Sequence, residues 1–315
     1  MGRFVLRRLV GLVPLLLVLS VAVFLLVYLI PGDPAVTLAG GEAATPERVA
    51  EVREQLGFDE PVVVQYGDWL ADAVRLDFGE SLYTGRAVGD ELRARLPVTA
   101  SVVLGSVVFA LLVGIPLGVL GGMRPASKTD SAVTALASLG IAMPSFWLAM
   151  ILIIVFGLEL DWLPVRGYVS FAESPWEWFR HLILPSIALG TLMGATLARQ
   201  LRGALADVLE ADYVRTARAK GLGPVRVVGK HAFKNAAMPA VTILGLQIAY
   251  LFGGTVIIEE IFALPGVGTY LVNAIVGQDV PIIQGGIMML AVFVVLANLI
   301  VDLTYGFLNP KVRVS

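Results

Sequence analysis

The chain has 315 residues, of which 57% are hydrophobic and 15% charged, with a formal net charge of −2 and a mean hydropathy of +0.82. Soluble domains carry about 25% charged residues, so this composition excludes an ordinary soluble protein and indicates a membrane protein. The chain contains no cysteine, which excludes a disulfide framework and a thiolate metal site.

The first apolar run, residues 9–30, follows Arg3, Arg7 and Arg8 and carries no charge over its 22 positions. The apolar core of a secretory signal peptide has only about 7–15 residues and is followed by a small-residue cleavage site. Here Pro31-Gly32-Asp33-Pro34 follows instead. We therefore predict a retained first transmembrane helix that ends in an interfacial turn.

Residues 31–97 form the one sizeable hydrophilic segment of the sequence. Glycine, proline and aspartate signals delimit three expected helical stretches, at residues 46–56, 61–76 and 88–96. Apolar and aromatic side chains recur in the segment, Trp69 and Phe78 among them. We therefore expect it to fold as a small helical cap.

Five further apolar runs follow, at residues 98–123, 131–158, 181–198, 237–258 and 285–303. The second half of the first of them contains Gly114, Pro116, Gly118, Gly121 and Gly122. Small residues permit close contact between membrane helices, and a proline within a span permits a kink. Met143-Pro144 interrupts the next run, which predicts a break inside the membrane. The sequence therefore predicts an all-α membrane protein with six transmembrane helices, and loops at residues 159–180 and 259–284.

The distribution of charge predicts the orientation of these helices. Six spans place both termini on one side, and the segments on that side hold 15 of the 23 basic residues, whereas the opposite side holds 20 of the 25 acidic residues. Basic residues resist translocation across the membrane. We therefore predict cytoplasmic termini, a cytoplasmic loop at residues 199–236 and an extracytoplasmic segment at residues 31–97.

The cytoplasmic loop is expected to form a helix, a sharp turn and a second helix. Gly221 suits the position after a helix C-terminus, and Pro224 suits the first position of the next helix. In that second helix a basic stripe lies opposite an apolar face, which is expected to pack on the bundle. The basic residues are Arg226, Lys230 and Lys234, and the apolar residues are Val225, Val228, Ala232, Phe233 and Ala236. Alternatively, these cations only fix the topology of the chain and contact lipid phosphates.

The ordered pattern Asp212-Tyr213-Val214-Arg215-Thr216-Ala217-Arg218-Ala219-Lys220-Gly221-Leu222 resembles the cytoplasmic loop of ABC-importer permeases of the dipeptide, oligopeptide and nickel family. The resemblance extends along the whole chain. Further matches are Pro31-Gly32-Asp33-Pro34, Asp77-Phe78-Gly79-Glu80-Ser81, Pro144-Ser145-Phe146-Trp147 and Glu260-Ile261-Phe262-Ala263-Leu264-Pro265-Gly266-Val267-Gly268. It implies a type I importer-like fold and a multi-pass protein of the bacterial plasma (inner) membrane.

The same resemblance implies that the loop docks on an ATPase subunit. The implied coupling residues are Asp212, Tyr213, Arg215, Thr216, Ala217, Ala219, Gly221 and Pro224. The broader importer pattern has Glu-Ala-Ala, three residues and then Gly, so Arg215 stands here in place of the acidic residue, as in the peptide branch. The implied partners are a second homologous permease in a heterodimer, two ABC ATPase subunits, an extracytoplasmic substrate-binding protein and the lipid bilayer, with no nucleic acid.

The sequence contains no Gly-x-x-x-x-Gly-Lys-Ser/Thr phosphate loop, so the chain is not expected to be an enzyme or to bind a cofactor itself. ATP and magnesium are expected on the partner ATPase subunits. A stand-alone gradient-driven carrier is the alternative of another class, but such carriers place ionisable residues near the midplane, and the central parts of the first five spans have none. The expected cargo is a dipeptide or oligopeptide, with nickel chelates and glutathione as alternatives.

Two further groups of residues are candidates for sites. Polar residues on the spans are candidates for lining the translocation path, although helix packing also explains such residues; they are Ser145, Thr191, Thr196, Gln247 and Tyr250. Residues after the fifth span are candidates for an outer gate or a binding-protein contact, or else are solvated end charges; they are Glu259, Glu260, Phe262 and Pro265. The expected organisation is an N-terminus and first span (1–30), a cap (31–97), a permease core (98–306) and a tail (307–315).

Overall fold

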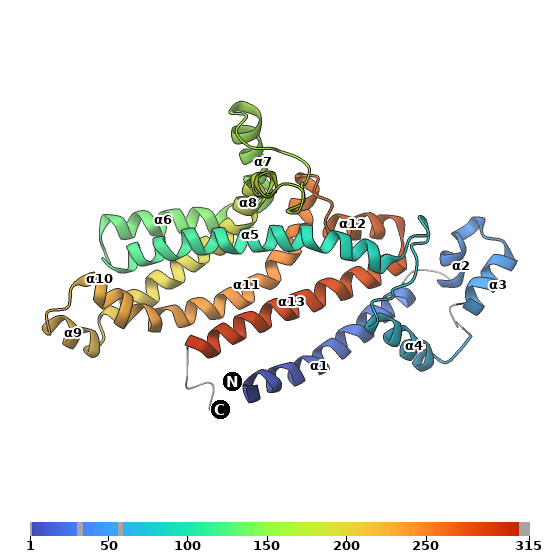
Figure 1. Cartoon of the computed structure of the whole chain (residues 1–315), viewed down its shortest axis with the longest axis horizontal. Coiled ribbons are helices and arrows are strands. Elements are labelled where there is room, and N and C mark those ends of the chain that lie inside the picture. Colours follow the sequence, from blue (N-terminus) through green and yellow to red (C-terminus); the bar gives the residue numbers. More distant parts are fainter. Residues whose placement is uncertain (1, 30–33, 56–58, 309–315) are drawn as a thin grey trace. The chain divides into compact units, whose positions relative to one another are not determined.

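The computed structural model describes residues 2–29, 34–55 and 59–308. The turn motif at residues 31–33 and most of the C-terminal tail lie outside the described residues. The described chain is helical throughout its regular elements (Figure 1). The elements are α1 (Gly2–Leu25), η1 (Leu26–Leu29), α2 (Pro34–Ala39), η2 (Gly41–Ala43), α3 (Pro46–Gln55), α4 (Val62–Val74), α5 (Val88–Gly122), α6 (Lys128–Ala142), α7 (Ser145–Leu152), η3 (Ile153–Glu159), α8 (Pro175–Leu209), α9 (Asp212–Ala219), α10 (Pro224–Arg226), η4 (Val227–Ala232), α11 (Phe233–Ile261), α12 (Val267–Gly277) and α13 (Val280–Leu308).

Five of these helices are long and apolar enough to cross a membrane, and the bent pair α6 and α7–η3 adds a sixth where it is counted as one broken span. The described residues therefore hold five or six candidate spans, a range that includes the predicted six. Several boundaries differ from the prediction. The expected separate helix at residues 88–96 is the first part of α5, and the expected loop at residues 259–284 contains α12.

The chain divides into two compact units. Unit 1 comprises Val98–Pro265 and Leu296–Ser315, and unit 2 comprises Gly2–Pro97 and Gly266–Val295. The hydrophilic segment belongs to unit 2, in which α4 and the start of α5 share an apolar cluster with α1 and α12. The chain passes from one unit to the other within α5, between α11 and α12, and again within α13.

Unit 1 is organised around α8, which packs against α6, α7 and α11 (Figure 1). Glycines of α5 bring α5 against α8 with no room for a side chain. A Cβ atom added at Gly114 would lie 2.7 Å from the carbonyl oxygen of Gly194, and one at Gly118 would lie 2.9 Å from that of Ala198. Contacts this short cannot be relieved by rotating a side chain, because the neighbour is backbone. The predicted close helix contact is therefore confirmed.

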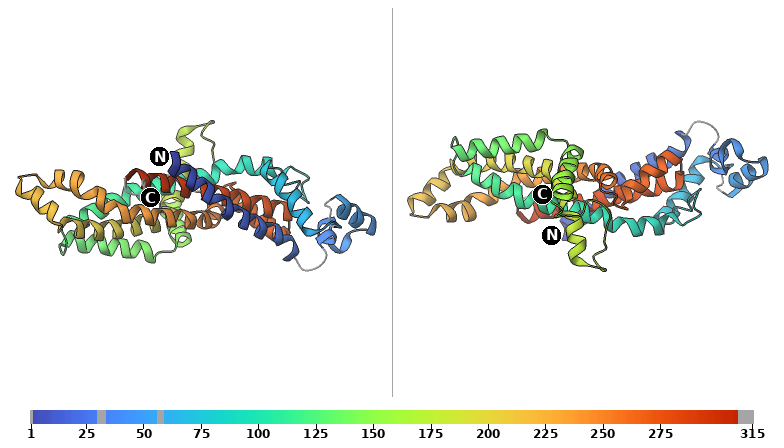
Figure 2. Two further views of the ribbon diagram at one scale, coloured as in Figure 1. Left: turned by 90° about the horizontal axis from the view of Figure 1, so that it is seen from below. Right: turned by 90° about the horizontal axis from the view of Figure 1, so that it is seen from above.

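The third span breaks at the predicted position. Met143 and Pro144 separate α6 from α7, and the two helices are bent by 100°. Proline has no amide hydrogen and a fixed φ, and Pro144 adopts an extended ψ of 136° as the N-cap of α7. Helix α7 therefore departs from the direction of α6 at this break while it still packs against α8, and α9 follows at the C-terminal end of α8 (Figure 1 and Figure 2).

The loop that the sequence predicts to be cytoplasmic has the expected helix, turn and helix. Gly221 follows α9 with a φ of +80°, which favours glycine, and Pro224 begins α10. One part of the prediction is wrong, since Val225 is 81% exposed while Val227 is buried. The π-type turns of η4 cause the difference, because they wind more than 3.6 residues per turn and shift the apolar face.

Unit 2 is built on a cluster that includes Phe78, Val88, Leu92 and Val267. The loop between α4 and α5 packs on the junction of α12 and α13. Phe78 fills the space left by Gly285, where a Cβ atom would meet its ring at 2.8 Å. Ser81 Oγ donates a hydrogen bond of 2.7 Å to the carboxylate of Asp279. The motif Asp77-Phe78-Gly79-Glu80-Ser81 is thereby explained as a packing element of this unit.

Candidate functional site

A cavity of about 340 Å³ in unit 1 is the first candidate site. Its walls come from the break between α6 and α7, from the middle of α8 and from the middle of α11. The lining residues are Ile141, Ala142, Met143, Pro144, Ser145, Leu189, Leu192, Met193, Gln247, Tyr250, Leu251 and Gly254. The lining contains no ionisable side chain other than the phenol of Tyr250, so the cavity is neutral and mostly apolar.

The structure brings three of the five predicted path residues into this cavity, namely Ser145, Gln247 and Tyr250. Thr191 and Thr196 do not line it. The hydroxyl of Thr191 donates to the carbonyl of Ile187 at 2.6 Å, and that of Thr196 donates to Leu192 at 2.8 Å. Each hydroxyl thus donates its hydrogen one turn back along its own helix, which leaves only its acceptor lone pairs.

Most of the lining is apolar and was not predicted from the sequence. Met143, Leu189 and Met193 are examples, and their type gives no signal, since apolar residues dominate every span. The one available signal is the Met143-Pro144 break, because a discontinuous helix in a membrane is tolerated where it borders protein or a water-filled cavity.

The second candidate site is the exposed face of α9. The opposite face holds Val214 and Ala217, which are buried in a cluster with Leu209, Val227 and Ala232. Ala217 is only 6% exposed, so it lies on the buried face of α9, opposite the face that a docking partner would contact.

The remaining predicted coupling residues are accessible. Those exposed in this segment are Asp212, Tyr213, Arg215, Thr216, Ala219, Gly221 and Pro224. Their spacing in α9 follows one helical face, with Asp212, Arg215, Thr216 and Ala219 at three- and four-residue intervals. Asn235 Nδ2 donates to the hydroxyl of Tyr213 at 2.9 Å, which ties α9 to the start of α11. The exposed face of α9 thus combines ionic, hydroxyl and small side chains.

The four residues predicted for the outer gate separate into two pairs. Glu260 and Pro265 are exposed, whereas Glu259 and Phe262 are buried. Glu259 is 0% exposed and accepts a hydrogen bond of 2.6 Å from the hydroxyl of Thr99, so it is not a solvated end charge. Only Glu260 and Pro265 present side chains to a partner in this structure.

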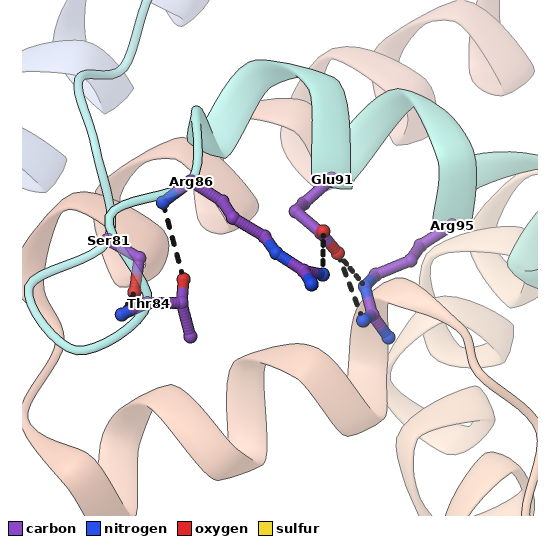
Figure 3. Close-up of polar contacts among 5 residues, drawn as sticks. All are labelled: Ser81, Thr84, Arg86, Glu91 and Arg95. Carbon is purple, nitrogen blue, oxygen red and sulfur yellow. Dashed lines mark hydrogen bonds and ion pairs between the residues drawn. The ribbon is translucent and has the colours of Figure 1, made fainter.

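A polar cluster lies at the start of α5 in unit 2, and Figure 3 shows Glu91 between two arginines. Arg86 Nη1 donates to Glu91 at 3.0 Å, and Arg95 Nη2 donates to it at 3.1 Å. The guanidinium of Arg95 also lies 4.4 Å from the centre of the Tyr270 ring on α12. Burial raises the pKa of Tyr270 above its usual value, and the nearby carboxylates of Glu91 and Asp279 add to this effect.

Within the same cluster the backbone of the loop is held by hydroxyl groups. The Thr84 amide donates to Ser81 Oγ, and the Arg86 amide donates to Thr84 Oγ1 (Figure 3). Every group drawn there has a partner within the cluster. These contacts fix the loop on α5 and α12.

Comparison with protein families gives two matches that together cover most of the chain. Residues 114–314 match the family described as "Binding-protein-dependent transport system inner membrane component". Residues 1–103 match the family of the N-terminal part of such membrane components.

Relatives with similar sequences extend over the full length of the chain. It is 41% identical over 313 residues to a putative peptide transport system permease protein of Brucella abortus (strain 2308), covering 99% of both chains. It is 38% identical over 330 residues to a dipeptide transport system permease protein of Alkalihalophilus pseudofirmus, covering 98% of this chain and 99% of the relative. A glutathione transport system permease protein of Escherichia coli (strain K12) is 41% identical over 313 residues, with 99% of both chains covered.

A solved structure with a similar fold is the MetNI methionine ABC transporter in an inward-facing conformation. The match has a TM-score of 0.57 and 17% sequence identity, and it covers 70% of this chain and 96% of the other. At this identity the likeness concerns the fold alone, which is that of an ABC importer permease.

Proposed function

Because the chain belongs to the family of inner-membrane components of binding-protein-dependent transport systems, we propose that it is the permease subunit of an ATP-driven importer for peptides. The permease itself carries no catalytic residue in this proposal. ATP and magnesium bind to two ATPase subunits on the cytoplasmic side. An extracytoplasmic binding protein delivers the cargo, and a second homologous permease completes the path.

The observation that carries this proposal is that two helices of unit 1 connect the cavity with the exposed face of α9. Helix α8 lines the cavity with Leu189 and Met193, and its last buried residue, Leu209, contacts the cluster beneath α9. Helix α11 lines the cavity with Gln247, and its beginning carries Asn235, the hydrogen-bond partner of Tyr213. A force applied to α9 therefore reaches the two cavity walls that α8 and α11 form, because these helices are rigid.

The neutral lining of the cavity supports peptides as the cargo class. Peptides differ in charge and side chain, and a cavity without a fixed charge does not select among them by electrostatics. Apolar walls with a few hydrogen-bonding groups suit side chains and amides alike. The names of the relatives, which refer to peptide, dipeptide and glutathione transport, support the same class. Selection among peptides is then a task of the binding protein.

The orientation follows the distribution of charge, with both termini and α9 cytoplasmic and residues 31–97 extracytoplasmic. In this orientation α9 faces the ATPase subunits. The exposed residues Glu260 and Pro265 are then on the outer side, where the binding protein docks.

The test uses the complete complex reconstituted in lipid vesicles with its ATPases and binding protein. Peptide uptake should require ATP, and the binding protein loaded with peptide should stimulate ATP hydrolysis. Ala142→Trp places a large ring in the cavity lining and should block uptake, whereas Ala135→Trp, about two turns earlier on α6 and exposed outside the lining, should not. Uptake driven by an ion gradient without ATP would refute the proposal in favour of a carrier.

A further inference from the structure

An ion pair inside unit 1 joins α6 to α8, in the part of α8 that leads to α9. Asp130 in the first turn of α6 is buried, and the guanidinium of Arg202 in α8 donates to both of its carboxylate oxygens. The hydrogen bond from Nε to Oδ1 is 2.6 Å long. The amide of Ala126 donates to the same carboxylate at 2.9 Å, so this group also holds the turn that precedes α6. The contact is therefore a two-point fork between two helices of the same unit.

Helix α5 leaves the space that the side chain of Arg202 occupies. A Cβ atom added at Gly121 would lie 3.1 Å from Cγ of Arg202 and 3.1 Å from Cγ1 of Val133 on α6. One added at Gly122 would lie 2.8 Å from the carbonyl oxygen of Arg202. The fork therefore forms where three helices meet, and the close approach of α5 restricts the positions that the arginine can take.

Stability alone does not explain a buried ion pair. The desolvation of two charges offsets much of their attraction, and replacing such a pair by well-packed apolar residues is often neutral or stabilising. A bidentate pair of arginine and carboxylate adds a fixed geometry, because its two parallel hydrogen bonds resist both rotation and sliding. Near the other end of α6 the contact is between small groups, since a Cβ atom at Gly140 would lie 2.9 Å from that of Ala195. Such a contact brings α6 close to α8 but lacks directional bonds, so the ion pair is what fixes the register of the two helices.

The two ends of α6 serve different parts of unit 1. Its last turn supplies Ile141 and Ala142 to the cavity lining, about 17 Å along the helix from Asp130 at 1.5 Å per residue. In the described part of the chain, α6 contributes no residue to the cluster beneath α9, whereas Leu205 and Leu209 of α8 belong to it. These two leucines follow Arg202 by one and two turns. A displacement of α9 therefore reaches the cavity wall at the α6–α7 break through α8.

We propose that Asp130 and Arg202 are positioning residues that lock α6 to α8, so that the cavity wall at the α6–α7 break moves together with α8 when an ATPase displaces α9. The inference rests on the proposed function, which supplies the ATPase, and it adds a third moving wall to the two that α8 and α11 form. Both residues act through α6. Loss of the pair should therefore uncouple α6 alone and leave α8 connected to α9.

The test follows two walls separately in the complete transporter, with its ATPases and binding protein, in membranes. Because the chain has no cysteine, single cysteines at Ala142 on α6 and at Leu192 on α8 report one wall each, and both positions are exposed in the cavity lining. The rate at which each cysteine reacts with a small maleimide is measured without nucleotide and with a non-hydrolysable ATP analogue. Both rates should change several-fold in the parental transporter. Arg202→Lys keeps the positive charge but lacks the fork, so it should abolish the change at Ala142 and preserve the change at Leu192.

Arg180→Lys is the matched control for this substitution. Arg180 lies on the same helix, and its side chain is 33% exposed against 34% for Arg202. Its ion pair with Glu177 joins two residues of one helix, so it fixes no helix against another. This variant should therefore keep both nucleotide-dependent changes.

Asp130→Asn is the second variant, because it removes the charge but keeps an oxygen for the amide of Ala126, and it should give the same result as Arg202→Lys. A change at Ala142 that survives in both variants would overturn the inference, as would loss of the change at Leu192 as well. Failure of both variants to assemble with the ATPases would show a purely structural pair and would also overturn it. In the parental transporter, a change at Leu192 without one at Ala142 would refute the inference alone, whereas no change at either position would refute the proposed function too.

Discussion

Replacing Ala217 by aspartate should release α9 from the body of unit 1. Ala217 is 6% exposed and lies in an apolar cluster with Val214 and Val227. Ala219, two residues further on, is exposed. The same substitution at Ala219 therefore introduces the same charge on the same helix without burying it, which makes Ala219→Asp the matched control.

Two responses to the buried aspartate compete, and their magnitudes decide the outcome. Keeping the side chain buried and neutral at pH 7 requires its pKa to rise by about 3 units, or roughly 4 kcal/mol, and an unsatisfied polar group adds about 1–3 kcal/mol. Undocking α9 instead exposes Val214 and a few neighbouring methyl groups, which costs about 2–3 kcal/mol. Undocking is the cheaper response, so α9 should leave the cluster while the membrane helices stay folded.

The assay is limited trypsin digestion of the full-length permease purified without the ATPases, so that a docked partner does not shield Arg215, Arg218 and Lys220, the cleavage sites in this segment. Ala217→Asp should increase the cleavage rate there by tenfold or more and should reduce co-purification of the ATPase. Ala219→Asp should keep the wild-type cleavage rate. If this variant nevertheless co-purifies with less ATPase, the loss reflects a weaker docking contact and not a released helix. Wild-type cleavage of Ala217→Asp would refute the packing of α9 on the cluster.

Three other predictions concern packing, topology and the cavity. Gly118→Ala should lower the unfolding temperature in detergent, because overpacking costs about 1–3 kcal/mol. The control Gly203→Ala, with open space around its Cβ, should raise the unfolding temperature or leave it unchanged. The reverse order would contradict the close contact of α5 with α8. Gly67→Cys should react with an impermeant thiol reagent in intact cells and Gly229→Cys only after permeabilisation, both being exposed with open space around the Cβ. Thr196→Val should leave peptide uptake near the wild-type rate, and a tenfold loss would show that its hydroxyl serves the cargo.

Much of the fold could be predicted because the signals are local. Three such signals determine the backbone through their own chemistry. They are a charge-free run of 22 residues, a proline in the middle of another run, and Gly221 three positions before Pro224. The break at Pro144 and the positive φ of Gly221 are found where the sequence indicated them. Helix α12 was missed because a helix of 11 residues is too short to cross a membrane and therefore gives no span signal. Its apolar face also packs on elements that are distant in the sequence.

The site could be predicted only in part because a side chain's partners depend on the tertiary structure. A threonine in a membrane helix has the same sequence signal whether its hydroxyl faces a cavity or bonds one turn back, as Thr191 does. Glu259 has the signal of a charge at a helix end, yet Thr99, 160 positions away in the sequence, supplies its hydrogen bond in the interior. The register of η4 depends on π-type turns, which hydrophobic periodicity at 3.6 residues does not detect.

Glycine shows most clearly what the structure adds to the sequence. Gly114 and Gly253 both lie inside membrane helices, and both fit a pattern of small residues that permits helix contact. In the structure the space beside Gly114 is filled by α8 of the same chain, and the space beside Gly253 is empty. The first glycine is therefore explained within one subunit, and substituting it should destabilise that subunit alone. A Cβ atom at the second would meet nothing within 4 Å in the described part of the chain, so substituting Gly253 by alanine should leave the folded subunit stable, and this difference in stability separates the two glycines.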